Sequence, residues 1–195
     1  MVLCFWCRSS MPSRANHKRC QCAVLIVGIA AHIAFANPGA AHTVAPADDV
    51  VMCGLLQMHK QFQHAIDHCD AALQATPNNA DTFSNRGSAN LALGRLEQAM
   101  ADFGRAIEQQ PGDASNYFNR ALAHAAAEQN DRAIADYTKA LELMPTLAIA
   151  HNNRGLAYEK LGERDKAIAD FRAALAIAPN LKMIENNLRR LGAAP

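Results

Sequence analysis

The chain has 195 residues, of which 50% are apolar, 19% are charged and 6% are aromatic, and its formal net charge at pH 7 is +1. Binding to the phosphates of a nucleic acid needs a strongly positive face, and a charge this close to zero does not supply one. The composition therefore predicts no nucleic-acid partner.

Residues 1–36 contain the three parts of a secretory signal peptide. Residues 1–19 carry four basic residues and no acidic one, and the apolar run of residues 20–36 ends in Ala34-Phe35-Ala36. These parts predict cleavage after Ala36. The run is shorter than the ~20 residues that a membrane-spanning helix needs. An uncleaved anchor that tethers the chain to a membrane through residues 20–36 is the alternative, and Met11 is an alternative start.

Whether residues 1–36 are cleaved or remain as an anchor, the rest of the chain is expected across the membrane, in the periplasm or outside the cell, because basic residues stay on the cytoplasmic side. Cleavage removes four of the 19 basic residues and none of the 18 acidic ones. The mature chain then has 15 basic and 18 acidic residues, a net charge of −3. This negative charge also argues against nucleic-acid binding.

A flexible lead-in is expected at residues 37–47, and a single pattern then recurs up to residue 181. Its clearest markers are four prolines spaced 34 residues apart, Pro77, Pro111, Pro145 and Pro179. Each unit contains two stretches of about a dozen residues with apolar side chains at i, i+3, i+4 and i+7, the pattern of a half-buried helix. A break between the two helices is predicted at Lys60, Gly94, Glu128 and Gly162.

Two positions within the unit have a constant character. The eighth residue is small (Cys53, Gly87, Ala121, Gly155), and the twenty-fourth is large except in the first unit (Cys69, Phe103, Tyr137, Phe171). In its period and in these positions the chain resembles the tetratricopeptide repeat, a 34-residue helix-turn-helix unit. The resemblance covers residues 46–181 and is weakest in the first unit.

This resemblance implies an all-α solenoid of four helix pairs that forms a right-handed superhelix. The pairs are expected at residues 48–79, 80–113, 114–147 and 148–181, and the first helix is expected to be capped by Asp48 and Asp49. Residues 182–195 have one apolar and one basic face, and they are expected to form a helix that caps the stack.

Four of the six cysteines lie in the signal region, which leaves Cys53 and Cys69. Their midpoint, residue 61, falls in the predicted turn, so the two side chains should face one another across an antiparallel helix pair. In an oxidising compartment this arrangement predicts a disulfide. The alternative is a pair of buried free thiols.

The chain lacks a glycine-rich phosphate loop, a nucleophile elbow and a His-Glu-x-x-His motif. We expect no enzymatic activity and no cofactor. The charged residues that recur with the unit are interpreted as a solvated helix face, with pairing between neighbouring units as the alternative; they are Arg86, Arg120 and Arg154, and Asp102, Asp136 and Asp170. His64 and His68 share a helix face, but no further ligands follow, so no metal site is predicted.

The strongest functional signal is an asparagine at the sixth position of successive units: Asn85, Asn119, Asn153 and, in the last helix, Asn187. An asparagine amide offers both a donor and an acceptor. The resemblance implies that such a ladder lines the concave surface of the superhelix and holds the backbone of an extended peptide. The alternative is surface asparagine that recurs because the units were duplicated.

Phe118, Leu122 and Asn152 occupy neighbouring groove positions, and the first two are candidate apolar anchors. The groove is expected to be neutral to mildly acidic. We therefore predict a binding scaffold for a protein or an extended peptide in the cell envelope. A structural subunit that self-associates is the alternative, and a metal-binding or redox protein is a third, weaker hypothesis. The sequence does not define the oligomeric state.

Overall fold

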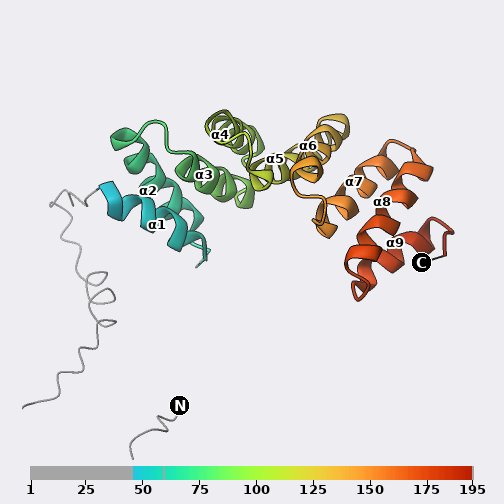
Figure 1. The fold of residues 1–195 in the computed structure, drawn as a ribbon. Coiled ribbons are helices and arrows are strands. Elements are labelled where there is room, and N and C mark those ends of the chain that lie inside the picture. Colours follow the sequence, from blue (N-terminus) through green and yellow to red (C-terminus); the bar gives the residue numbers. More distant parts are fainter. Residues whose placement is uncertain (1–45, 59, 195) are drawn as a thin grey trace, which may run out of the picture. The chain divides into compact units, whose positions relative to one another are not determined.

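The structure is a computed structural model that describes residues 46–58 and 60–194; the predicted signal peptide and residues 37–45 of the lead-in lie outside the described residues. The described residues form helices and no strands, which confirms the all-α solenoid (Figure 1). The helices are α1 (Pro46–Met58), α2 (Phe62–Ala75), α3 (Ala80–Ala92), α4 (Leu96–Gln109), α5 (Ala114–Ala126), α6 (Asn130–Leu143), α7 (Ala148–Lys160), α8 (Arg164–Ile177) and α9 (Lys182–Arg190).

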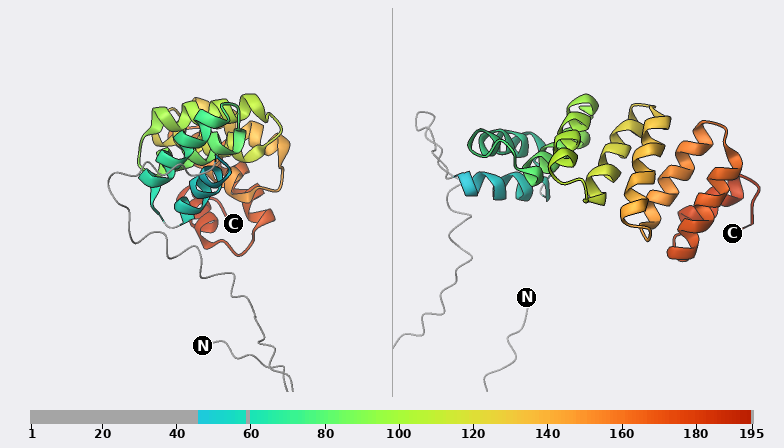
Figure 2. Two further views of the ribbon diagram at one scale, coloured as in Figure 1. Left: turned by 90° about the vertical axis from the view of Figure 1, so that its left-hand side faces the viewer. Right: turned by 45° about the horizontal axis from the view of Figure 1, so that its top comes forward.

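Each helix packs on the next one in the chain, and consecutive helices lie side by side along the array (Figures 1 and 2). Helix α1 also contacts α3, and α3 contacts α5. The odd-numbered helices therefore approach one another on one side of the array. This is the side on which the predicted asparagine ladder lies, because Asn85, Asn119, Asn153 and Asn187 all belong to odd-numbered helices.

The first helix of each pair ends where the sequence predicts a break. The φ angle is 58° at Lys60, 72° at Gly94, 59° at Glu128 and 76° at Gly162. The backbone N–H of the residue that follows each of these four positions donates to the carbonyl five residues before it, as Arg95 does to Asn90. The end of each of these helices is therefore hydrogen-bonded. Glycine adopts this left-handed backbone without strain, whereas Lys60 and Glu128 adopt it at a cost.

Helix α1 begins at Pro46, within the segment expected to be a flexible lead-in. A proline fits the first turn of a helix because its missing N–H has no partner there anyway. Asp49 consequently lies inside the helix and is not its cap. Its carboxylate Oδ1 lies 2.7 Å from Nδ1 of His68 on α2.

The core of a helix pair is an aromatic ring packed against a small residue. Phe103, Tyr137 and Phe171 are buried. A Cβ placed on Gly87 would lie 3.0 Å from Cε1 of Phe103, so a larger residue there would require the ring to shift. At the C-terminal end, Ile184 and Leu188 of α9 pack on Phe171 and complete this core.

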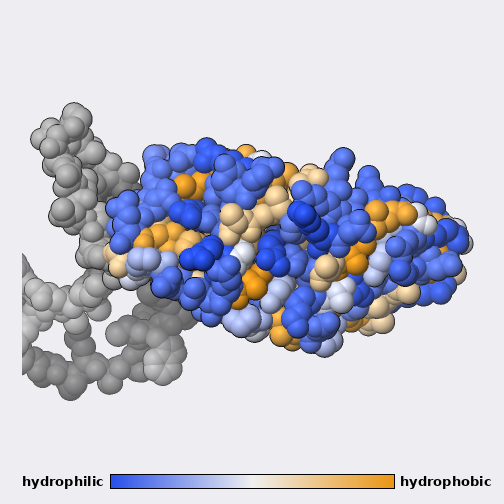
Figure 3. All heavy atoms as spheres, turned by 90° about the horizontal axis from the view of Figure 1, so that it is seen from above, coloured by the Kyte–Doolittle hydropathy of each residue, from blue (hydrophilic) through white to orange (hydrophobic). Residues whose placement is uncertain are grey.

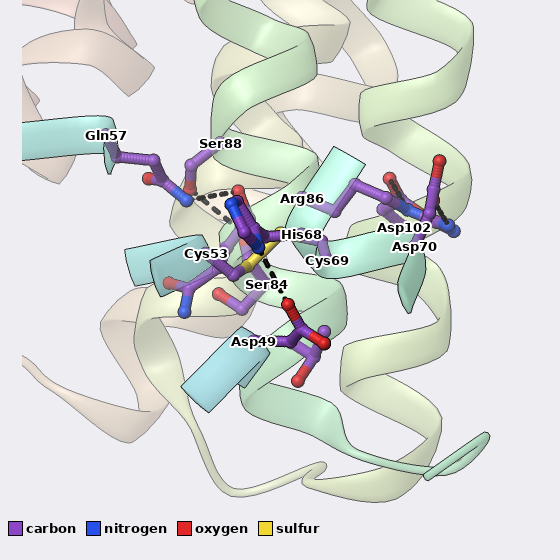
Figure 4. The surroundings of a disulfide bond; sticks show 12 residues. Asp49, Cys53, Gln57, His68, Cys69, Asp70, Ser84, Arg86, Ser88 and Asp102 are labelled. Carbon is purple, nitrogen blue, oxygen red and sulfur yellow. Dashed lines mark hydrogen bonds and ion pairs between the residues drawn. A yellow bond between two sulfur atoms is a disulfide. The ribbon is translucent and has the colours of Figure 1, made fainter. Parts of the chain in front are cut away.

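In the first helix pair the two corresponding positions hold Cys53 and Cys69. The structure joins them in a disulfide, with their Cα atoms 5.0 Å apart (Figure 4). This is the bond expected from their equal distances to the turn. Both residues are fully buried.

The surface seen in Figure 3 is mostly hydrophilic, with separate apolar patches distributed along the array. Within residues 46–58 and 60–194, none of the helices combines the length and the apolar character needed to cross a bilayer.

Candidate functional site

A cleft between the third and fourth helix pairs holds two of the predicted groove residues, Leu122 and Asn153. Its volume is about 630 Å³, and its walls come from α5, α6, α7 and α9. The lining residues are Leu122, Ala125, Asn130, Tyr137, Asn153, Leu156, Ala157, Glu159, Lys160 and Arg190. We refer to this space as the Asn153 cleft. Leucine and alanine side chains form its apolar part, and the amide of Asn153 lies among them.

A row of hydrogen-bonded side chains runs along one side of this cleft. Nδ2 of Asn152 donates to Oδ1 of Asn153 over 3.1 Å, and Nδ2 of Asn187 donates to Oδ1 of Asn152 over 2.9 Å. Nη2 of Arg190 donates to Oδ1 of Asn187 over 3.2 Å and to Oε2 of Glu159 over 2.6 Å. The row fixes the amides of Asn153 and Asn187 before any ligand arrives.

Tyr137 extends this row on the other side of Asn153. Burial raises the pKa of the Tyr137 phenol to about 12, and a side-chain hydrogen bond with Asn153 partly offsets this effect. Tyr137 is only 1% exposed, so its hydroxyl stays protonated at neutral pH and acts as a neutral partner for Asn153. The ring of Phe118 lies 5.8 Å from that of Tyr137, centroid to centroid.

The other two ladder residues have different surroundings. Asn119 is half-buried, and among the described residues no hydrogen bond to its side chain is formed. Asn85 lies next to α1, because a Cβ placed on Gly54 would be 3.5 Å from Nδ2 of Asn85. Its backbone carbonyl accepts a hydrogen bond from Nε2 of Gln57.

The recurring arginines and aspartates are not a solvated face, so that interpretation was wrong. Arg154 binds Asp170 through two nitrogens, with Nε 2.8 Å from Oδ2 and Nη2 2.7 Å from Oδ1. The same bidentate pair joins Arg120 to Asp136 and Arg86 to Asp102. Each pair lies within one unit, and the aspartates are buried. The recurrence of these residues with the unit correctly indicated a structural role, but the sequence did not show that the aspartates are buried.

These ion pairs hold the guanidinium groups in their charged form. The hydrogen bonds that Arg120 donates to Asp136 raise the pKa of Arg120, and those that Arg154 donates to Asp170 raise the pKa of Arg154, each against the opposing effect of burial. Nη1 of Arg154 also donates to Oγ1 of Thr138 in the preceding pair, over 2.9 Å. Nη1 of Arg86 likewise donates to Asp70 in the preceding pair. The residue of the preceding pair that faces Arg120 is Gly104, which has no side chain to accept a hydrogen bond.

Models of known families match most of the array. A tetratricopeptide repeat model matches residues 148–181, a TPR repeat model matches residues 125–162, and a second tetratricopeptide repeat model matches residues 55–114. The chain belongs to the tetratricopeptide repeat family. No curated protein matches the chain significantly.

Solved TPR structures share this fold. MamA is 22% identical with a TM-score of 0.71, over 75% of this chain and 80% of MamA. YrrB, described as a TPR protein with an unusual peptide-binding site, is 23% identical with a TM-score of 0.69, over 74% of this chain and 75% of YrrB. The TPR domain of Arabidopsis OM64 is 29% identical with a TM-score of 0.57, over 58% of this chain and 93% of that domain.

The TPR fold brings some of the predicted groove residues together. Asn153 and Leu122 line one cleft, and Asn187 connects to Asn153 through Asn152. Asn152 itself is only 1% exposed, so its side chain supports the ladder from inside and does not form part of the groove surface. Phe118 packs partly into the core formed around Tyr137.

Sequence reasoning missed Tyr137, Lys160 and Arg190 as parts of the cleft. Tyr137 carries a recognisable signal, because it has a hydroxyl at a position where the second and fourth units have phenylalanine. Lys160 and Arg190 give the lining two cations against the single carboxylate of Glu159. The groove was expected to be neutral to mildly acidic, and this part of it is not.

The histidines of α2 serve as structural partners or lie in solvent. Nδ1 of His68 bonds Asp49, while His64 is exposed and lies 3.9 Å from Asp67. Within the described part of the chain, no three His, Cys, Asp or Glu side chains come close enough together to hold a metal ion.

Proposed function

We propose that this TPR protein is a non-catalytic scaffold that binds an extended peptide, or an extended segment of another protein, along its odd-numbered helices. The Asn153 cleft is its main contact. The observation that carries this proposal is the preordered row of amides from Asn153 to Asn187 beside a cleft that has both apolar and charged lining residues. A site whose side chains are already fixed loses little conformational entropy on binding.

The size and lining of the cleft suit a peptide. Leu122 and Leu156 provide apolar contact for a ligand side chain, and the Asn153 amide still has donor and acceptor capacity beyond its bond to Asn152. Asn119, on the preceding odd-numbered helix, is available for the next peptide unit. The ligand is therefore bound through its backbone by amides and through a side chain by the cleft.

The recurring charged residues support a non-catalytic role. Arg86, Arg120 and Arg154 are each committed to a buried aspartate of their own unit. Groups engaged in this way stabilise the fold and are not available for proton transfer. Peptide binding by other TPR proteins also supports the proposal, since YrrB is described with a peptide-binding site and the first TPR of Spaghetti is bound to an HSP90 peptide.

We place this activity in the cell envelope or outside the cell. The signal-like residues 1–36 and a disulfide, which persists in oxidising compartments, support that location. Fractionation of cells that produce the tagged full chain, together with N-terminal sequencing of the mature form, tests it. An uncut chain in the cytoplasm would contradict both export and cleavage after Ala36.

Selection of peptides from a random displayed library against the oxidised full chain tests the binding function. The dissociation constant of the selected peptide is then measured with an Asn119→Ala, Asn153→Ala double variant. We expect binding to weaken by about 10- to 100-fold, the loss of one or two hydrogen bonds to a buried ligand. Asn78→Ala, in an exposed turn between the first two helix pairs, is the matched control and should bind as the unaltered chain does.

A second candidate function is self-association, and an exposed apolar edge favours it. Large apolar side chains gather at the turns of the third and fourth helix pairs and at the start of α9: Leu143, Met144, Ile149, Ile177, Leu181 and Met183. The corresponding turns of the first two pairs carry Gln109, Gln110 and Thr76 instead. Sedimentation over a range of concentrations distinguishes this function, because it requires no peptide.

A further inference from the structure

The disulfide replaces the packing contact that holds the other helix pairs together. In the second and fourth pairs, an aromatic ring packs against a glycine, Phe103 on Gly87 and Phe171 on Gly155. At these same two positions the first pair has Cys69 and Cys53, joined by their sulfur atoms (Figure 4). Two cysteine side chains bury far less apolar area than a phenylalanine ring does.

The remaining core of the first pair is small. Its buried apolar residues are Cys53, Ala65, Ile66, Cys69 and Ala72. Of the large apolar side chains on α1, Val51 is 58% exposed and Leu55 is 42% exposed, because no earlier helix covers them within the described residues. Helix α1 is therefore held at Cys53 and by Leu56, which packs with Phe62 on a small cluster formed by α2 and α3.

The first pair also lacks the bidentate ion pair of the others. Met52 stands where the other units have arginine, and His68 stands where they have the buried aspartate. In place of that ion pair, His68 makes a single contact to Asp49. Figure 4 shows this contact beside the disulfide, with Arg86 of α3 directed at Asp70 and Asp102.

The geometry points to an oxidation-dependent end of the array: we propose that the first helix pair is folded only while Cys53 and Cys69 are joined. A dithiol reductant gives two electrons and two protons to the sulfurs and itself becomes a disulfide, which leaves two thiols in the chain. Without the cross-link, neither a fully buried aromatic ring nor a bidentate ion pair holds α1 against α2 among the described residues; the partly buried Leu56 and Phe62 and the contact of His68 with Asp49 remain. Helices α1 and α2 then unfold while α5 to α9 stay folded.

Unfolding of α1 also alters the proposed peptide-binding surface, a consequence that rests on the proposed function. Gln57 of α1 donates to the backbone carbonyl of Asn85, and Gly54 lies against the Asn85 amide. Loss of α1 therefore removes the neighbour of the first ladder residue. The Asn153 cleft, which is built from α5 to α9, is unaffected. The oxidised chain thus presents a longer groove than the reduced chain.

Hydrogen exchange of the full chain, with and without dithiothreitol, tests this proposal. We expect the protection of amides in α1 and α2 to fall by roughly 100-fold on reduction, the change predicted by the loss of a cross-link over a loop of this size. Protection in α5 to α9 should stay the same. Unchanged protection in α1 and α2, or loss of protection throughout the array, would overturn the proposal.

Two variants control for the four cysteines of residues 1–36, which also meet the reductant. Cys53→Gly with Cys69→Phe restores the usual glycine and aromatic pair, and it should keep α1 and α2 protected in the presence of dithiothreitol. Cys53→Ala with Cys69→Ala should leave these helices unprotected with or without reductant; protection in that variant would contradict the proposal. Hydrogen exchange needs no ligand, so a result that contradicts the redox proposal leaves the peptide-binding function intact. Failure to find a bound peptide would likewise leave the redox proposal intact.

Discussion

Gly155 and Phe171 are in such close contact that a Cβ placed on the glycine would lie 2.8 Å from Cε1 of the ring and 3.2 Å from the carbonyl oxygen of Ala167. Gly155→Ala should therefore lower the free energy of unfolding by about 1–3 kcal/mol, the usual cost of overpacking, even though alanine favours a helix. Urea denaturation followed by circular dichroism measures this change.

The matched control is Gly104→Ala in the middle of α4. Its nearest neighbour would be Nη1 of Arg120 at 3.9 Å, so the added methyl group meets no obstacle. We expect this variant to be more stable by about 0.5–1 kcal/mol. Equal effects of the two substitutions would show that helix propensity, and not the contact with Phe171, decides the outcome at Gly155.

The buried ion pair between Arg154 and Asp170 leads to a second prediction. Arg154→Met leaves the buried Asp170 carboxylate with His151, at 3.1 Å, as its remaining hydrogen-bond partner among the described residues, and should destabilise the fold by about 3 kcal/mol. Arg154→Met combined with Asp170→Leu removes both charges and should recover most of that loss. Thermal unfolding at pH 7 compares the two variants, and a double variant as unstable as the single one would contradict the argument.

The raised pKa of Tyr137 predicts a loss of stability at high pH. The folded-state pKa of about 12 lies above the ordinary tyrosine value of 10.0, so above pH 10 the unfolded chain releases a proton that the folded chain retains. The contribution of Tyr137 is fully present below pH 10 and is lost as the pH rises towards 12, by about 2–3 kcal/mol in total. Urea midpoints at pH 8 to 11 measure the slope. Tyr137→Phe should remove this part of the slope, and an identical slope in the variant would exclude Tyr137 as its source.

The left-handed turns provide a further test with two opposite substitutions. Glu128 has a φ of 59° and Gly162 has a φ of 76° at the same place in successive units. Glu128→Gly should raise the stability and Gly162→Ala should lower it, each by about 1 kcal/mol, because only glycine adopts this backbone without strain. Melting temperatures of the two variants should shift in opposite directions; shifts of the same sign would show that these turns are not strained.

The sequence was sufficient for the architecture because each step of the prediction depended on spacing along the chain. The four prolines set the period, the glycines at 94 and 162 set the turns, and the positions of Cys53 and Cys69 relative to the turn predicted their bond. The turns and the bond are relationships within a single helix pair, and the period is a regular spacing along the chain. Secondary-structure periodicity determines them directly.

The candidate site could not be predicted to the same extent, because it depends on how one helix pair is rotated against the next. That rotation buries Asn152 and brings Arg190 of α9 to Glu159 of α7. It also pairs Tyr137 with Asn153 of the following unit. Periodicity places each of these residues on a helix face, but it does not show which face of the neighbouring unit it meets.

The arginines that span successive helix pairs also bear on the mechanics of the array. Arg86 reaches Asp70 of the pair before it, and Arg154 reaches Thr138, but Arg120 faces Gly104, which has no side chain to bond. The joint between the second and third pairs therefore lacks a cross-link that its neighbours have. Bending of the solenoid should concentrate at this joint. The Asn153 cleft lies between the third and fourth pairs, on one side of this joint, so such bending leaves it intact.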